Sequence, residues 1–537
     1  MIKRIVLITF VAVLALVGLL PLLVMLAQSV IIDGHISFAA YQDLLNSRSE
    51  WNLLGNSLIL SILTALLTTV VGMPLGILLA KTDLPFRRAF AVLFTVPLLM
   101  PPYILAVSWF DVLGREGFLA RFWGSSTAAV TSDFLFGLPG CVLVLFSTFL
   151  PIVMLLTMTF LKTINPRLEE AGKNFAGWFG VLKGITIPLI RPGIILSSLL
   201  VFLLTQGEFG VPLYLRYNVF SVVTFSEFSV SYDYRAATAG ALPLVGITLL
   251  VLLVERIYLR EKTYQVRLAS SGYKTIMIRL GSIRNWCVGL VSVLGFLVVV
   301  LPFLVLFMQS LSFEAYAQAL KLAGSSLLRS LTYAAIGASA LSVLGFFLGY
   351  LIHNRSLSIW RSVDSLTILL FALPSTIIGI GMILLWNRPT TNFIYATPVI
   401  IILGYIAQYS ALTSRVTVST LIQIPPSMEE AAQVVGAGWL RRMGMIVTPL
   451  AKRGLLAGWL VGYVFCLRDT GISMLVYPPG HDTFGVRIFT LMANGPADLI
   501  AALCVIMIAA TILPLGFLAL AFQLAPGVNR GTNARRK

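Results

Sequence analysis

Three ionisable residues stand inside apolar segments of this sequence, where a charged side chain is expensive. Glu208 lies late in one apolar segment, and Asp469 occupies the matching place in a later one, 261 residues further on, with Arg468 beside it. Ionisable groups at membrane depth cost about 2.5 to 3.5 kcal/mol on insertion scales and usually face an aqueous cavity or a partner. The two acids therefore line a cation path or close a gate, or else they satisfy the backbone of a broken helix or pair with Arg468. The sequence leaves these alternatives open.

A second pattern joins paired glutamates to small residues in two polar segments. The later segment reads Pro425-Pro-Ser-Met-Glu-Glu-Ala-Ala-Gln-Val-Val-Gly436, and the earlier one reads Asn165-Pro-Arg-Leu-Glu-Glu-Ala-Gly-Lys-Asn-Phe-Ala176. Each is predicted to form a short helix, because proline suits the helix start and the helix dipole favours glutamate in the first turn. The small Ala/Gly face of such a helix can be approached closely by another protein. The candidate contact residues are Glu170, Ala171, Gly172 and Ala176 in the first copy, and Glu430, Ala431, Ala432 and Gly436 in the second.

The composition indicates which elements position these residues. The chain has 537 residues, of which 58% are hydrophobic and 11% are charged, whereas soluble domains carry about 25% charged residues. A dozen apolar runs are long enough to cross a bilayer as helices, and they lack the short alternating segments of a β-barrel. We therefore predict an all-α polytopic membrane protein with about twelve transmembrane helices. The predicted spans are residues 5–32, 53–80, 89–113, 136–160, 193–214, 238–254, 286–309, 328–352, 362–386, 397–414, 455–477 and 498–522.

The distribution of positive charge predicts the orientation. With the N-terminus inside, 28 of the 38 Lys and Arg residues fall on the inner side, which is the positive-inside asymmetry of membrane proteins. Both termini are therefore expected in the cytoplasm, and the first apolar stretch is expected to be a retained helix. The net charge of +17 reflects this topology, so membrane lipid is the expected partner and nucleic acid is not.

The chain reads as an internal duplication. Gly72 and Gly76 recur as Gly345 and Gly349, with an offset of 273 residues, and their spacing favours close helix packing. Two halves of six spans each begin on the same side, so they are predicted to be parallel repeats. The predicted division is residues 1–262 for the first repeat, 263–285 for a basic cytoplasmic linker and 286–537 for the second repeat. The Glu-Ala segments are expected at about 161–192 and 421–454.

No sequence feature indicates an enzyme or a metal site. The four cysteines lie in apolar segments without paired spacing, and the three histidines are too scattered for a dedicated metal site. No arrangement of nucleophile, base and oxyanion donors emerges. The phosphate-binding pattern Gly-x-x-x-x-Gly-Lys-Ser/Thr is also missing from the sequence. We therefore expect no catalytic residue, no metal and no cofactor on this chain, and any ATP hydrolysis must come from a separate protein.

The second Glu-Ala segment resembles the Glu-Ala-Ala loop of binding-protein-dependent ABC importer permeases. That loop has the pattern Glu-Ala-Ala, three residues, Gly, nine residues and Ile-x-Leu-Pro. The first copy is degraded, because Gly172 and Ala176 stand at the second alanine and the glycine, and it is one residue shorter before Pro188. The second copy matches at Glu430, Ala431, Ala432, Gly436, Ile446 and Pro449, with Thr448 in place of leucine.

The resemblance implies a coupling helix in each half, seated in a cleft of a nucleotide-binding subunit. It implies two copies of a cytoplasmic ABC ATPase, which hold ATP and Mg, and a periplasmic or lipid-anchored solute-binding protein on the outer face of a bacterial cytoplasmic membrane. The implied mechanism is alternating access. His481, which follows Pro-Pro-Gly in an outer loop, is either an ordinary loop residue or a contact for the binding protein.

The segments Arg468-Asp469-Thr-Gly and Tyr477-Pro-Pro-Gly480 resemble the ferric iron members of this group. Ferric iron is therefore the leading substrate, with thiamine, a phosphonate or a polyamine as alternatives. An ion-coupled secondary transporter is the alternative from another class, but such a carrier has no reason to display two docking helices. Because the second Glu-Ala segment matches more closely, we expect removal of Glu430 to impair transport more than removal of Glu170.

Overall fold

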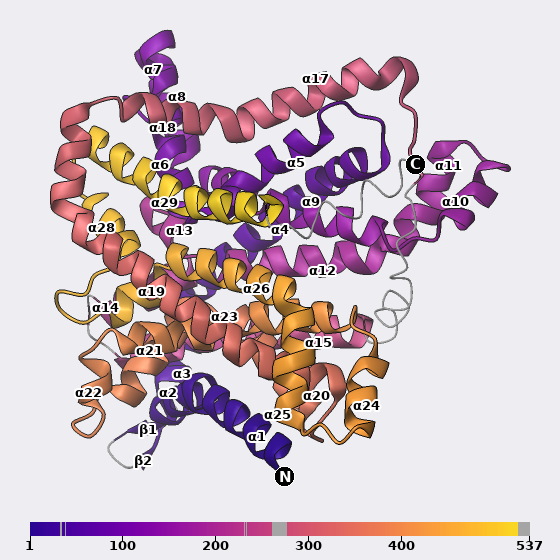
Figure 1. Cartoon of the computed structure of the whole chain (residues 1–537). Coiled ribbons are helices and arrows are strands. Elements are labelled where there is room, and N and C mark those ends of the chain that lie inside the picture. The colour runs from indigo at the N-terminus through magenta and orange to yellow at the C-terminus, as the bar shows by residue number, and fades with distance from the viewer. Residues whose placement is uncertain (33–34, 38, 230, 232–233, 260–275, 525–537) are drawn as a thin grey trace.

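The protein is almost entirely helical, with one short β-hairpin (Figure 1). The computed structural model describes residues 1–32, 35–37, 39–229, 231, 234–259 and 276–524. Within these residues, ten helices are long and apolar enough to cross a membrane, and two further helix pairs pass the same test together although they are bent by 103° and 106°. The prediction of an all-α polytopic protein with about twelve spans is thereby confirmed.

The first half contains six spans and several short connecting elements. Its elements are α1 (Ile2–Leu14), α2 (Leu20–Val30), β1 (Ile31–Ile32), β2 (His35–Ile36), α3 (Ala39–Asn46), α4 (Arg48–Lys81), α5 (Arg87–Thr95), α6 (Pro102–Leu113), α7 (Phe118–Trp123), α8 (Ser125–Leu135), α9 (Leu138–Leu161), α10 (Pro166–Lys173), α11 (Trp178–Val181), α12 (Ile187–Gln206), α13 (Gly210–Tyr214), α14 (Phe220–Ser229) and α15 (Tyr234–Leu259). A π-helical segment, Leu182–Thr186, makes α11 and α12 continuous.

The second half repeats this order. Its elements are α17 (Arg284–Gly295), α18 (Leu301–Gln309), α19 (Phe313–Asn354), α20 (Trp360–Ala372), α21 (Ser375–Trp386), α22 (Asn392–Tyr395), α23 (Val399–Leu421), α24 (Pro426–Val434), α25 (Trp439–Arg442), α26 (Thr448–Arg468), α27 (Gly471–Val476), α28 (Phe484–Leu491) and α29 (Ala497–Leu524). Most of the predicted linker, 263–285, lies outside the described residues, which resume at residue 276.

Four of the predicted spans are broken, which corrects the prediction of continuous helices there. The third and ninth spans break at Pro101 and Pro374, both of which have extended ψ angles of 137° and 134°. Proline cannot donate a backbone hydrogen bond and disfavours helix in the residue before it. The fifth and eleventh spans end early, at Gln206 and Arg468, and each is followed by a short helix, α13 or α27.

The glycine pairs of the repeat confirm their predicted packing role. A Cβ atom on Gly76 would lie 2.8 Å from the carbonyl oxygen of Met154 in α9, and one on Gly349 would lie 2.8 Å from the carbonyl oxygen of Ser414 in α23. The helix pairs α4 with α9 and α19 with α23 accordingly share the largest interfaces in the described molecule. Each half is therefore built around the same close helix pair.

The first span of each half packs against the other half. Helices α1 and α2 contact α19 and α21, and the rings of Phe10 and Phe347 stack at 4.3 Å. In the other direction, α18 contacts α6. The two repeats are therefore interlocked, although they are separate in sequence.

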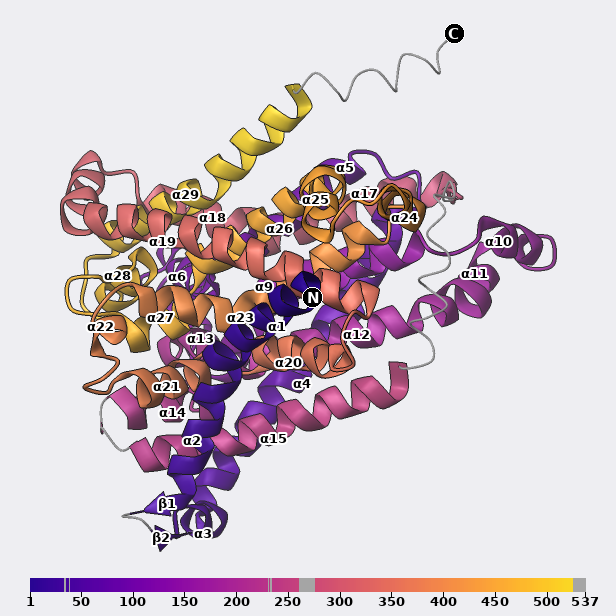
Figure 2. The ribbon, with the colours of Figure 1, turned by 60° about the horizontal axis from the view of Figure 1, so that its bottom comes forward.

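The two Glu-Ala segments lie toward the same end of the molecule. Helices α10 and α24 both appear on the right in Figure 1, and the hairpin β1–β2 and helix α22 appear on the left. The same arrangement is seen after a turn of 60° (Figure 2), with the start of α1 beside α25. The parallel repeat thus places equivalent polar segments on one side of the helical body.

Candidate functional site

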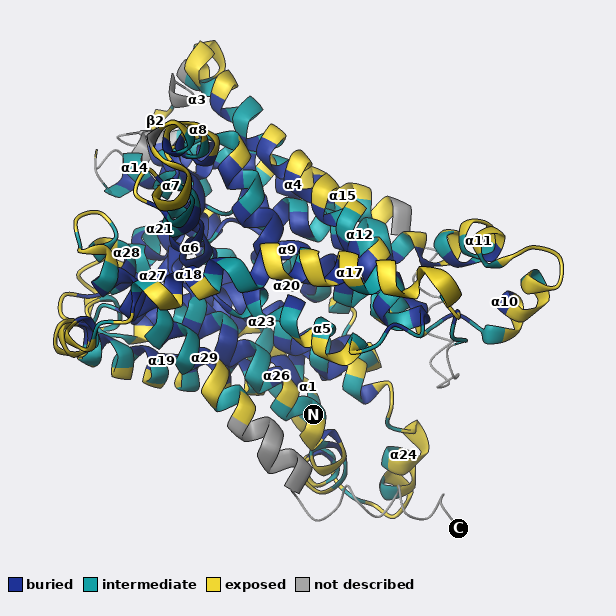
Figure 3. Cartoon of the chain, turned by 90° about the horizontal axis from the view of Figure 1, so that it is seen from above, coloured by how far each residue is buried: buried dark blue, intermediate teal, exposed yellow. Residues whose placement is uncertain are grey.

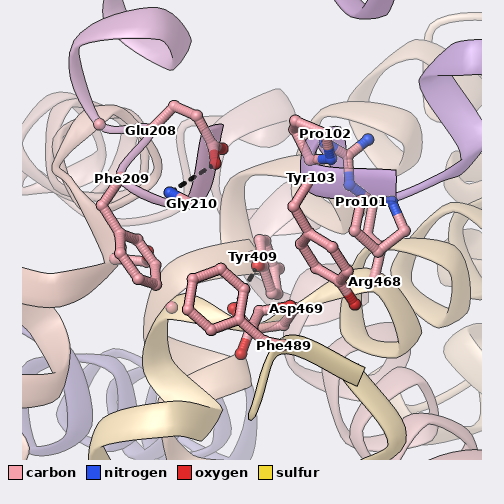
Figure 4. Close-up of a pocket in the computed structure, with 14 residues that line it drawn as sticks. Pro101, Pro102, Tyr103, Glu208, Phe209, Gly210, Tyr409, Arg468, Asp469 and Phe489 are labelled. Carbon is pink, nitrogen blue, oxygen red and sulfur yellow. Dashed lines mark hydrogen bonds between the residues drawn. The ribbon is translucent and has the colours of Figure 1, made fainter. Parts of the chain in front are cut away.

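A cavity of about 90 Å³ lies where the four broken spans meet (Figure 4). It brings together the three ionisable residues that the sequence singled out, Glu208, Arg468 and Asp469. Both halves contribute equivalent positions, since 207–210 in the first half correspond to 468–471 in the second. The lining residues are Pro101, Pro102, Tyr103, Gly207, Glu208, Phe209, Gly210, Ser375, Tyr409, Arg468, Asp469, Thr470, Gly471 and Phe489.

Glu208 caps the short helix that follows the break in the fifth span. Its Oε1 accepts hydrogen bonds from the backbone N–H groups of Gly210, at 3.0 Å, and Val211, at 3.4 Å. The first N–H groups of a helix have no partner within the helix, so a carboxylate at this place satisfies them. Glu208 therefore stabilises the start of α13 at the wall of the cavity (Figure 4).

Asp469 does the same for α27 and has an additional partner. Its Oδ2 accepts hydrogen bonds from the backbone N–H of Ser473, at 3.0 Å, and from the Ser473 hydroxyl, at 2.8 Å. Its Oδ1 accepts a hydrogen bond from the Tyr409 hydroxyl at 2.8 Å. The carboxyl is buried, so these three donors replace the water that it loses.

Arg468 links the two halves and pairs with neither acid. Its guanidinium donates a hydrogen bond to the carbonyl oxygen of Leu98 and lies 4.9 Å from the centre of the Phe465 ring. In the described part of the chain, no carboxylate oxygen lies within 4.0 Å of the guanidinium nitrogens. Of the alternatives open at the sequence level, the geometry thus supports satisfied helix breaks and not an Arg468 ion pair.

Sequence reasoning missed Tyr409 and Thr470 as cavity residues. Tyr409 stands in an apolar span, where an aromatic residue normally indicates packing, although its polar neighbours Gln408 and Ser410 were a signal. Thr470 is buried in the cavity wall beside Asp469.

In the first Glu-Ala segment, Glu169 is buried, whereas its neighbour Glu170, the candidate contact residue, is exposed. Glu169 forms an ion pair with Lys81, the last residue of α4, and its Oε1 accepts a hydrogen bond from the Thr186 hydroxyl at 2.8 Å. Both charged side chains are 2% exposed. Glu170 and Ala171 are exposed, and Gly172 is partly buried. The two adjacent glutamates therefore point to opposite sides, one to the spans and one to solvent.

The second Glu-Ala segment repeats this division with different partners. Glu429 accepts a hydrogen bond from the Tyr350 hydroxyl at 2.9 Å, and Nε of Arg442 lies 3.6 Å from the same carboxylate oxygen. The Glu429 side chain is 26% exposed. Glu430 and Ala431 are exposed, and Ala432 is partly buried. In both halves, the first glutamate of the pair thus attaches the helix to the spans.

The ends of the two Glu-Ala helices differ, which changes the alignment of the copies. Gly436 has a φ of 81°, and the N–H of Ala437 bonds back to the carbonyl of Ala432 at 3.0 Å. Gly177 and Gly438 occupy the same position before α11 and α25, and both have a φ of −62°. Ala176 therefore corresponds to Ala437, and Gly436 is the residue that the first copy lacks.

Large apolar side chains are exposed at the tips of both segments. In Figure 3, much of α10, α11 and α24 has the colour of exposed residues. Phe175 is 93% exposed beside α10, and Val434 is 88% exposed at the end of α24. Exposed apolar groups that cluster on polar segments mark protein interaction sites. Phe179 in the first segment, and Val435 and Leu440 in the second, are exposed as well.

The loop that contains His481 is held by α19, the second span of the second half. Nδ1 of His481 lies 2.9 Å from the Tyr333 hydroxyl, and Arg329 donates to the carbonyl oxygen of Gly480 at 2.7 Å. Ser57 and Ser330, at equivalent positions, each accept a hydrogen bond from the first residue of α14 or α28. The two loops are thus held by equivalent serines, and in the second half the contact between His481 and Tyr333 adds to this attachment. Among the described residues, no three His, Cys, Asp or Glu side chains come close enough to hold a metal ion.

Comparison with known proteins gives a family and several relatives. Residues 72–260 match the family model for the binding-protein-dependent transport system inner membrane component. The chain is 25% identical over 465 residues to the putative ferric transport system permease protein FbpB 1 of Haemophilus influenzae, which covers 81% of this chain and 71% of that protein. It is 26% identical to the ferric transport system permease protein FbpB of Actinobacillus pleuropneumoniae, over 80% of this chain and 65% of that protein.

A shorter relative is more similar in sequence. The molybdenum transport system permease protein ModB of Azotobacter vinelandii is 32% identical over 164 residues, which is 30% of this chain and 70% of that protein. The ferric relatives thus align with both halves, and the molybdenum relative aligns with less than a third of the chain. The chain spans about two thirds of the length of the Actinobacillus relative.

Proposed function

The chain belongs to the family of binding-protein-dependent transport system inner membrane components, and from that premise we propose that it is the permease subunit of an ATP-driven importer of ferric iron. The observation that carries the proposal is the pair of Glu-Ala helices, α10 and α24. They lie toward one end of the helical body, each is attached through its first glutamate, and each presents its second glutamate to solvent.

The proposed partners follow from these helices. Two copies of a cytoplasmic ATPase, which bind ATP and Mg, dock on α10 and α24 through the exposed apolar tips and the exposed Glu170 and Glu430. Both termini then lie in the cytoplasm of a bacterium, and a periplasmic or lipid-anchored binding protein delivers the solute at the opposite end. The chain itself binds no nucleotide or metal cofactor.

Ferric iron is the proposed substrate because two relatives that each align with about four fifths of the chain are named as ferric transport permeases. The molybdenum relative supports a second candidate, molybdate, through its higher identity over a short segment. The alternatives thiamine, phosphonate and polyamine have no support from these relatives. The ligand that co-purifies with the cognate binding protein distinguishes iron from molybdate.

The cavity at the four helix breaks is the proposed constriction of the pathway. Glu208 and Asp469 hold the starts of α13 and α27, so the wall of the cavity depends on both acids. ATP binding is proposed to draw α10 and α24 together, and the attached spans then widen the cavity toward the binding protein. Hydrolysis of ATP returns the pathway to its inward-facing state.

Reconstitution tests the proposal directly. The chain is placed in liposomes with its ATPase and with iron-loaded binding protein, and uptake of radioactive iron is measured. We expect iron uptake only when ATP is supplied on the side of the membrane where α10 and α24 lie. Uptake should stop when the ATPase is replaced by a hydrolysis-deficient variant. Uptake driven by an ion gradient without the ATPase would show a secondary transporter instead.

A further inference from the structure

We propose that Glu169 and Lys81 form a clamp that carries the movement of helix α10 into helix α4, so that the first Glu-Ala helix moves as one body with the first half. This inference rests on the proposed function, because the movement is the one that ATPase binding would impose. Glu169 is a positioning residue in this account, since its side chain faces the spans and not the proposed ATPase surface.

The clamp joins three elements at one point. Glu169 lies in the first turn of α10, Lys81 is the last residue of α4, and Thr186 ends the π-helical segment that leads into α12. One carboxylate oxygen pairs with the Lys81 ammonium and the other accepts the Thr186 hydroxyl. The carboxylate therefore holds α10 to the second span and to the fifth span of the same half.

The burial of the pair separates it from ordinary surface ion pairs. Both side chains are 2% exposed, whereas the side chains of the other ion pairs in the described ranges are 12% to 38% exposed. Desolvation offsets much of the attraction in a buried pair, so such a pair is weak evidence for stability. A buried pair does fix the relative position of its two elements, because separating the charges leaves each one unpaired in a poorly solvated site. Its natural role is therefore to keep α10 and α4 together when α10 is pushed.

The same end of α4 is attached to the chain that enters the second half. The carbonyl oxygen of Lys81 accepts a hydrogen bond from the N–H of Ile278 at 2.7 Å, and the N–H of Asp83 donates to the carbonyl of Ile278 at 3.2 Å. Asp83 Oδ1 also accepts the N–H of Leu280 at 2.9 Å. Residues 278–280 precede α17, whose continuation α18 packs on α6. In addition to the Glu169–Lys81 pair, residues 278–280 thus connect the end of α4 to α17 and α18, and through α18 to the third span at α6.

The test uses a neutral pair, a reversed pair and an exposed control in the reconstituted importer. The neutral pair Lys81→Met with Glu169→Gln avoids an unpaired buried charge and keeps an acceptor for Thr186. The reversed pair Lys81→Glu with Glu169→Lys restores the attraction. The exposed control is Lys452→Gln in α26, at a residue that lies outside the clamp and outside both Glu-Ala helices. For each variant, the amount of co-purified ATPase, the iron uptake and the stimulation of ATP hydrolysis by loaded binding protein are measured.

We expect the neutral pair to bind the ATPase at the wild-type ratio and to lose uptake and stimulated hydrolysis by about tenfold, a size typical of residues that carry coupling between sites. The reversed pair is expected to recover most of that loss, and the control to behave as wild type. The proposal is overturned if the neutral pair transports as wild type does, if it fails to bind the ATPase, or if the reversed pair recovers nothing. If the wild-type chain itself binds no ATPase, the proposed function fails and not only the clamp.

Discussion

The two Glu-Ala helices occupy equivalent places but are attached by different chemistry. In the first half, Glu169 is held by Lys81 and Thr186, whose equivalents in the second half are Asn354 and Val447. In the second half, Glu429 is held by Tyr350 and Arg442. The repeat has thus kept the glutamate and exchanged its partners.

The partners of Tyr350 make the second attachment broader. Nε1 of Trp439 donates to the Tyr350 hydroxyl at 3.3 Å, and the Lys3 ammonium lies 5.2 Å from the centre of the Tyr350 ring. The first attachment is a single buried point, and the second is a partly exposed network around the buried Tyr350, which also includes Lys3 in α1. We therefore expect the first to fail sharply when broken and the second to weaken gradually.

The largest expected effect is on the buried clamp. Glu169→Ala leaves Lys81 buried without a partner and should lower the free energy of unfolding by about 3–5 kcal/mol. Glu429→Ala removes a partly exposed acceptor, 26% exposed, and should cost about 1 kcal/mol. Thermal unfolding of the detergent-purified variants measures both losses. Equal losses would show that the two attachments are energetically the same.

The acids of the cavity offer the next comparison between the halves. Asp469→Ala removes the acceptor of three hydrogen bonds and leaves buried donors on Tyr409 and Ser473 unpaired, at a cost of about 2–3 kcal/mol. Glu208→Ala removes an acceptor of two backbone donors, and a cost of about 1–2 kcal/mol is expected. Chemical denaturation measures the difference. A larger loss for Glu208→Ala would contradict the hydrogen-bond account of the cavity.

The backbone conformation after the two Glu-Ala helices differs, and glycine-to-alanine substitutions test this difference. Gly436→Ala forces a side chain into a φ of 81°, which costs about 1–2 kcal/mol, whereas Gly177→Ala keeps an ordinary φ of −62°. We expect the first change to lower the melting temperature and to reduce ATPase binding, and the second to do neither. If Gly436→Ala binds the ATPase normally, the turn after α24 has no part in docking.

The smallest expected effect on stability comes from the two exposed glutamates. Glu170→Ala and Glu430→Ala should each change the free energy of unfolding by no more than about 0.5 kcal/mol, the range of neutral surface substitutions. Iron uptake should fall more for Glu430→Ala, because the second segment is closer to the Glu-Ala-Ala pattern. Uptake assays on both variants decide this. A greater loss of iron uptake for Glu170→Ala would instead show that the first Glu-Ala helix contributes more to transport than the second.

Much of the architecture was predictable because long apolar runs and a repeat leave few alternatives. Each of the twelve predicted spans overlaps one of the ten helices or two bent pairs, although the helices of the fifth and eleventh spans begin and end earlier than predicted. The offset between Glu208 and Asp469 correctly indicated equivalent places, and the cavity brings both together. Periodicity and repetition are properties of the sequence itself, so these features needed no knowledge of contacts.

Contacts between distant segments were beyond prediction from one sequence. Glu169 and Glu170 are adjacent and chemically identical, and only the position of Lys81, 88 residues earlier, decides which of them is buried. The packing of α1 and α2 on the second half was equally hidden, because an apolar span does not indicate its neighbour. The sequence left broken helices at Glu208 and Asp469 as one alternative, but it did not place the breaks after Gln206 and Arg468, because the residues that follow remain apolar enough to continue a span.

Site-directed cross-linking tests the central claim that α10 and α24 receive the ATPase. Cysteine is introduced in turn at Phe175, Val434 and, as a control near the opposite end, Phe393 in α22, all of which are at least 73% exposed. The importer is then treated with a short bifunctional reagent with and without ATP. We predict cross-links to the ATPase from positions 175 and 434, with yields that change with ATP, and none from position 393. Cross-links from neither 175 nor 434 in an importer that transports iron would contradict the account.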